Sequence, residues 1–169
     1  MSISHLKADI NRINWYDASC RITENFTVKE ALTLPSFDNV MHVPSEQEKE
    51  NIVVMAMRME RVRTILGFPI QVHCWIRPTC VKTNVAISPF NGKNYNEKVG
   101  GSYNSYHIVG SAVDFHVKGY SGNEGCNLMR TKLYPHLELL GLRMESIEGN
   151  WIHLDDRPVP QNGNRFFKP

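Results

Sequence analysis

The sequence lacks several features that would assign it to a class directly. It contains no stretch near the roughly 20 consecutive apolar residues that a membrane-spanning helix needs. Its first residues, MSISHLKADINRINWYD, hold no apolar core behind a basic start, so we expect no secretory signal. An excess of one charge is also missing, because 19 Lys and Arg face 17 Asp and Glu for a net charge of +2. We therefore expect neither a membrane partner nor a nucleic-acid partner held by bulk charge.

Cysteine is scarce and shows no metal-type spacing. The four cysteines form no CxxC pair: Cys20, Cys74, Cys80 and Cys126. Without a signal we expect reduced thiols in a cytoplasm, with a disulfide as the alternative that an even number leaves open. At 169 residues and 41% hydrophobic content, the chain has the size and composition of a single domain, residues 1–169, which we expect to be monomeric. Histidine stands out instead, with seven residues.

Helical signals come first along the chain. Ser45 and Glu48 form a capping box ahead of apolar residues at helical spacing, and Gly67 follows, so we predict a helix over 46–66. Weaker patterns predict short helices over 3–13 and 26–32.

The second half alternates strand signals with one helical segment. Strands are predicted over 70–76 and 112–117, and a helix over 123–140 that Pro135 interrupts. The runs 142–147 and 151–154 flank a turn and predict an antiparallel hairpin. Residues 79–104 read as a long loop, functional or mobile, and 157–169 as an irregular tail. This order predicts an α+β fold in which a small antiparallel sheet packs against helices.

Three residues form a candidate metal site. His107 precedes Asp114 by seven residues with Gly110 between them, and His153 follows 39 residues later in the predicted hairpin. Two imidazoles and one carboxylate suit zinc and leave a fourth position open, which is typical of a catalytic site. Zinc there would lower the pKa of a bound water and polarise a carbonyl.

These residues also carry a family resemblance. The segment from Ser105 to Asp114 reproduces the pattern SxHxxGxAxD of the zinc D-alanyl-D-alanine peptidases, and Trp151-x-His153 resembles their second signature. Residues 67–78, which include Arg77-Pro78, resemble the strand that ends in the family's substrate-binding arginine. The resemblance covers about residues 20–158 and implies the fold shared with hedgehog signalling domains.

The resemblance implies roles for four residues. His107, Asp114 and His153 would bind one zinc ion per chain. Arg77 would hold a substrate carboxylate or the developing oxyanion, a task suited to its planar charged fork. A surface ion pair is the alternative reading of Arg77.

The general base departs from the family pattern. Many members place a glutamate three residues before the last histidine, and some place a histidine two before it. This chain has Asn150 and Trp151 there, and its nearest carboxylate is Glu148 in the predicted turn. We take Glu148 as the catalytic acid–base candidate, with an exposed turn residue as the alternative.

Other residues are expected to support the site. Asp155 and His116 share strand faces with His153 and Asp114, so each could orient a zinc ligand by hydrogen bonding. Ser105 and Trp151 are candidates for substrate binding, Ser105 also by stabilising its own loop.

The expected function follows from the resemblance. It implies a zinc peptidase that cuts a peptide bond in bacterial peptidoglycan stem peptides, as a carboxypeptidase or an endopeptidase. We expect a phage endolysin or virion-associated lysin, made in the host or bacterial cytoplasm and acting on the cell wall after release. The alternative is a non-catalytic zinc-containing binding module of the same fold.

Overall fold

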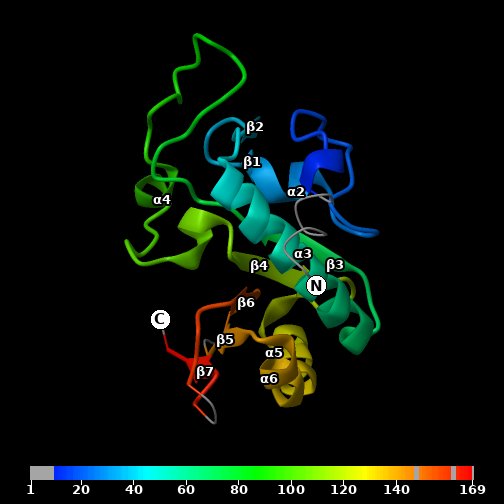
Figure 1. The fold of residues 1–169 in the computed structure, drawn as a ribbon. Helices are drawn as coiled ribbons and strands as arrows, with labels where there is room; N and C mark the ends of the chain where they lie inside the picture. Colours follow the sequence, from blue (N-terminus) through cyan, green and yellow to red (C-terminus); the bar gives the residue numbers. More distant parts are fainter. Residues whose placement is uncertain (1–9, 147–148, 161–162, 169) are drawn as a thin grey trace.

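The computed structural model describes residues 10–146, 149–160 and 163–168. The described helical elements are α2 (Val28–Leu32), α3 (Glu46–Leu66), α4 (Tyr95–Lys98), η1 (Tyr106–Val109), α5 (Gly122–Leu133), η2 (Tyr134–His136) and α6 (Leu137–Leu140). The strands are β1 (Thr33–Leu34), β2 (Val40–Met41), β3 (Ile70–Cys74), β4 (Ala112–Val117), β5 (Arg143–Glu145), β6 (Ile152–Asp155) and β7 (Phe166–Phe167). The predicted α+β class is confirmed (Figure 1).

The main sheet has the strand order β3-β4-β6-β5-β7 in the described part of the chain, and β1 and β2 form a separate antiparallel pair. The β3–β4, β4–β6 and β5–β6 pairs are antiparallel, as predicted. The sheet is mixed at one edge, where β7 adds a parallel pair with β5 to the predicted antiparallel sheet. The tail over 157–169 thus contributes an edge strand, which two residues are too short to reveal by alternation.

Helix α3 organises the core and begins and ends where the sequence predicts. The Ser45 hydroxyl accepts a hydrogen bond from the Glu48 backbone, and the Glu48 carboxylate accepts one from the Ser45 backbone at 2.6 Å. Gly67 ends the helix in the left-handed region, at φ +78°. The buried face consists of Ile52, Val53, Met55, Ala56, Met59, Val62 and Leu66. Burial of each larger apolar side chain contributes about 1.5–3 kcal/mol, so this face fixes the helix against η1, α5 and α6.

The predicted interruption at Pro135 is confirmed. Helix α5 ends at Leu133, the turn η2 contains the proline, and α6 resumes over Leu137–Leu140. No helix among the described residues is long and apolar enough to cross a membrane.

The loop over 79–104 is more ordered than its composition suggests. It contains the one-turn helix α4, in which Tyr95 is buried. The ring of Phe90 stacks on Phe37 with centroids 4.8 Å apart, and Tyr95 meets Phe37 edge-on at 5.0 Å. These aromatic contacts attach the loop to the segment between β1 and β2.

Candidate metal centre

Asp114 lies in a row of side chains that crosses three neighbouring strands. In the β4–β6 register it is directly opposite His153. In the β3–β4 register it is opposite Cys74, because a β-bulge between Val72 and Cys74 shifts the pairing by one residue. Directly opposed residues on adjacent strands share a face of the sheet, so the three side chains point the same way.

The 3-10 turn η1 brings His107 to this row. Ser105 caps the turn by accepting a hydrogen bond from the His107 backbone at 3.3 Å, which confirms its expected local role. The His107 ring is fixed through Nδ1, which donates to the Trp75 carbonyl at 2.7 Å. A carbonyl can only accept, so Nδ1 carries a proton, and Nε2, which faces Asp114, is the nitrogen that can bind a metal once its own proton is displaced.

Three predicted ligands converge in the structure. His107 Nε2 lies 3.2 Å from Asp114 Oδ1 and 3.2 Å from His153 Nδ1. His153 Nδ1 lies 2.7 Å from the same Asp114 oxygen. His107 and Asp114 are 1% and 6% exposed, so the donors are shielded from bulk water.

The glycine of the motif has a steric role between His107 and Asp114. Gly110 sits at φ +77°, and a Cβ there would lie 2.8 Å from Ile52 Cγ1 of α3. Nearby, the Asn51 side-chain amide donates to the Val109 carbonyl at 2.8 Å. Contact with α3 thus sets the position of η1, and it requires a residue without a side chain.

We expect Gly110→Ala to destabilise the protein more than Gly119→Ala. Gly119 has a similar φ of +87° but open space around it, so its substitution reports backbone strain alone, about 1–2 kcal/mol. At Gly110 the added methyl must also displace Ile52, which should cost about 1–3 kcal/mol more. Urea unfolding of both variants measures the difference, and equal losses would contradict a close approach of η1 to α3.

In this cluster, burial and the neighbouring charges shift the pKa values of His107 and Asp114 in opposite directions. Burial lowers the pKa of His107, but the Asp114 carboxylate outweighs it and raises that pKa to about 10. Burial likewise raises the pKa of Asp114, and the two imidazoles outweigh it and hold that pKa well below its ordinary value. The pKa of His153 is raised by Asp114 and Asp155 against the effect of burial. The carboxylate therefore favours cations beside it, either protons on the imidazoles or a metal ion that displaces them.

Asp155 lies beside His153, on the side of the ring away from Asp114. Its Oδ2 lies 3.6 Å from His153 Nε2, the ring nitrogen turned away from the other donors. Arg143 fixes Asp155 with two hydrogen bonds of 2.8 and 2.6 Å, and the guanidinium of Arg143 lies 4.0 Å from the ring centre of Phe167 on β7. Strand β7, which was not predicted, therefore helps to hold Arg143 and, through it, the Asp155 carboxylate beside His153.

Arg77 reaches the cluster, and Cys74 lies there unexpectedly. The Arg77 guanidinium contacts Asp114 through Nη2 and donates from Nε to the Cys74 sulfur at 3.2 Å. Its ion pair is with the cluster itself, so the alternative of an unrelated surface pair does not describe it. Cys74, His107 and Asp114 each offer a ligand atom within 4.8 Å of the others. Burial raises the pKa of the Cys74 thiol, but His107 and Arg77 outweigh it and lower that pKa.

The other predicted site residues, His116, Trp151 and Glu148, have no described contact with the three predicted zinc ligands. The hydrogen-bond partner of the His116 ring among the described residues is His73, and no contact with the three donors is found for it there. Trp151 is 38% exposed, and its carbonyl accepts from the buried Arg130, which also donates to the Gly149 carbonyl at 3.3 Å. Glu148, the acid–base candidate, lies outside the described residues.

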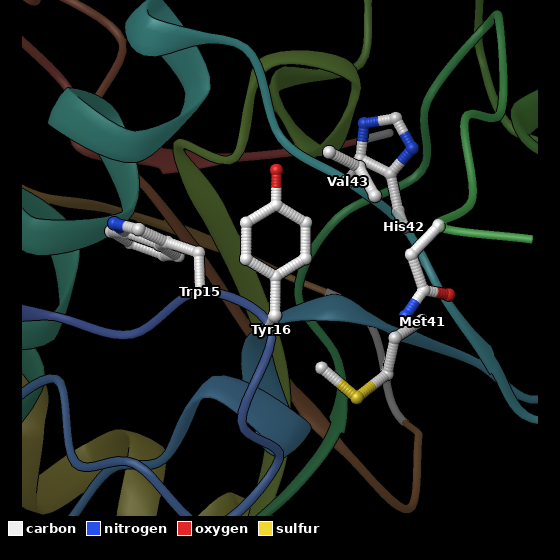
Figure 2. A pocket seen from close by; sticks show the side chains of 6 residues that line it. Trp15, Tyr16, Met41, His42 and Val43 are labelled. Atoms are coloured by element: carbon white, nitrogen blue, oxygen red, sulfur yellow. The ribbon is translucent and has the colours of Figure 1, made fainter.

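A separate pocket of about 230 Å³ is lined by Trp15, Tyr16, Met41, His42, Val43 and Asn84 (Figure 2). None of the three predicted zinc ligands lines it. The His42 ring is already engaged, accepting from the Lys82 backbone at 3.2 Å and lying 3.4 Å from Glu48. Both ring nitrogens of His42 therefore have partners within the protein, and these contacts hold the segment before α3 against Lys82 and Glu48.

Comparison with known families identifies the class. The peptidase M15 family matches residues 24–155, most of the chain, and the protein belongs to that family. The match confirms the resemblance predicted over about 20–158 and implies a hydrolase of peptide bonds that depends on zinc. No match was found among curated proteins or among solved structures.

The donor set fits zinc. Two imidazole nitrogens and a carboxylate oxygen lie 2.7–3.2 Å from one another, close enough to bind one ion together. The nitrogens of His107 and His153 that face away from the donors meet a carbonyl and a carboxylate, the usual supports of metal-binding histidines.

Sequence reasoning missed Cys74. The alternation of β3 places Gln71 and His73 on the face shared with Asp114, and only the bulge moves Cys74 onto it. Its position three residues before Arg77 was the available signal, and it does not reveal a bulge.

Proposed function

We propose that this protein is a zinc metallopeptidase that hydrolyses a peptide bond in the stem peptides of bacterial peptidoglycan. The observation that carries the proposal is the convergence of His107, Asp114 and His153 beside Arg77 in a chain of the M15 family. In the proposal these three residues hold one zinc ion. When bound, zinc supplies Lewis-acid polarisation of the scissile carbonyl and activation of water.

Arg77 supplies the fixed positive charge for the substrate. A guanidinium carries five N–H donors in a planar fork, and the contacts to Cys74 and Asp114 use Nε and Nη2. In the proposal, Nη1 binds a stem-peptide carboxylate or the oxygen on which negative charge develops. The ion pair with Asp114 holds the guanidinium in place for this contact.

Proton transfer is assigned to Glu148. Its carboxylate accepts a proton from the attacking water and delivers it to the departing amine, which completes hydrolysis of the peptide bond. Asp155 and Arg143 keep the His153 ring oriented while the reaction proceeds. Ser105 stabilises η1, and Trp151, which is partly exposed two residues before His153 in the sequence, offers an aromatic surface to the substrate.

The proposal includes a biological setting. The protein acts as a monomeric phage endolysin or virion-associated lysin, made in a cytoplasm and reaching peptidoglycan after release. Expression in bacteria with and without a separate membrane pore tests this setting. Lysis only when both are present supports an endolysin, and lysis by the protein alone contradicts it.

A non-catalytic zinc module of the same fold is the competing function, favoured by the unusual residues Asn150 and Trp151 at the family's base positions. Turbidity of chloroform-treated Gram-negative cells separates the two. A peptidase lowers turbidity, stops after chelation and resumes when zinc is returned. A binding module leaves turbidity unchanged throughout, and activity that survives thorough zinc removal would contradict a metallopeptidase.

A further inference from the structure

We propose that Cys74 is a fourth protein ligand of the metal, so that its thiolate closes the position expected to be open in the His107–Asp114–His153 site. This inference rests on the proposed zinc function and adds a ligand to it. The carrying observation is the Cys74, His107 and Asp114 group, whose ligand atoms all lie within 4.8 Å of one another.

The backbone places Cys74 there through a specific irregularity. Gln71 pairs with His116 and Val72 with Phe115, so a regular strand would pair His73 with Asp114. The bulge inserts one residue and pairs Cys74 with Asp114 instead. Asp114 then has a metal-binding side chain on each neighbouring strand, Cys74 on β3 and His153 on β6.

The surroundings of the sulfur suit a thiolate ligand. The Arg77 Nε–H donates to Sγ at 3.2 Å, which places a fixed positive charge beside it. Cys74 is free of any disulfide, so its sulfur is available to a metal. Thiolate is a preferred zinc ligand and favours softer metals such as cadmium over magnesium, calcium or manganese.

A thiolate in the fourth position changes how the site works. Four protein ligands saturate tetrahedral zinc, the arrangement of a closed site. A bound zinc would then accept water or substrate only if Cys74 gave up its position or the ion took a fifth ligand. The contact with Arg77 links that exchange to the residue proposed to bind substrate.

Cobalt substitution of the full-length protein tests the ligand directly. Cobalt(II) bound to a thiolate shows an intense sulfur-to-metal charge-transfer band in the near ultraviolet, which nitrogen and oxygen ligands do not produce. We expect this band in the wild type and in Cys80→Ser, and its loss in Cys74→Ser. Cys80 is the matched control because it is an exposed free cysteine six residues further along.

Metal affinity provides the second readout. Loss of an outer-shell partner typically weakens metal binding about 10–100-fold, so loss of a direct ligand should weaken cadmium binding at least tenfold in Cys74→Ser and leave Cys80→Ser unchanged. Cobalt bound by the wild type without the charge-transfer band would overturn the Cys74 assignment and leave the three-ligand zinc peptidase intact. A folded wild type that binds no metal would overturn both.

Discussion

Asp114→Ala is expected to lose its zinc, from one ion per chain to almost none, and with it the hydrolysis of peptidoglycan. Asp114 is the residue that all the other donors share, since His107, His153 and Arg77 each contact its carboxylate. Without this carboxylate, the remaining groups are the Arg77 guanidinium, which repels a divalent cation, and two imidazoles, which hold it only weakly. The rate should fall by more than the ~10²–10⁴-fold typical of losing one acid–base group.

Zinc content by atomic absorption, measured after gel filtration, checks this result. Asp114→Asn keeps the size of the side chain, so it separates loss of charge from loss of packing, and circular dichroism reports whether each variant folds. Asp156→Asn is the matched control, because Asp156 also belongs to an ion pair, 2.5 Å from Arg58, but is not among the cluster's contacts. Full zinc retention by Asp114→Ala would remove Asp114 from the ligand set.

Glu148→Gln is expected to keep its zinc and lose most of its rate. The amide preserves size and hydrogen bonding but cannot carry the proton from water to the departing amine. Hydrolysis should slow by ~10²–10⁴-fold, with little change in KM if Glu148 acts only in proton transfer. Steady-state kinetics on a soluble stem-peptide substrate, beside a zinc assay, measures both quantities.

Glu145→Gln is the natural comparison, because Glu145 lies on β5 only three residues earlier. It should retain the wild-type rate. A Glu148→Gln variant with near-normal kcat would transfer the proton-accepting role to another group. Loss of zinc from that variant would instead make Glu148 part of the metal site.

Local sequence signals were sufficient for the elements that carry the site. The capping box at Ser45 and the helical periodicity after it predicted α3. Strict alternation predicted β4, with Asp114 on the same face as Ala112 and His116. The turn signal between 142–147 and 151–154 predicted the hairpin of β5 with β6. The opposition of His153 and Asp114 arises in the separate β4–β6 pair, which no turn signal marks. The predicted elements depend on neighbouring residues, which is why periodicity reveals them.

The features that escaped prediction depend on contacts between distant segments. The bulge that turns Cys74 toward Asp114 leaves no mark in an alternating run such as Ile70–Cys74. The strand β7 is defined by pairing with β5, and two residues have no period to detect. The bidentate pair of Arg143 with Asp155 likewise arises from the β5–β6 register and not from either local sequence.

The central claim is that zinc held by His107, Asp114 and His153 enables this chain to cut peptidoglycan stem peptides. Mass spectrometry of purified peptidoglycan after digestion tests it most directly, with zinc-loaded, zinc-stripped and zinc-restored protein compared side by side. We predict new muropeptides, each gaining one water at a single type of peptide bond, with the loaded and restored protein only. Identical spectra for the loaded and the stripped protein, whether both cleaved or both intact, would contradict the claim.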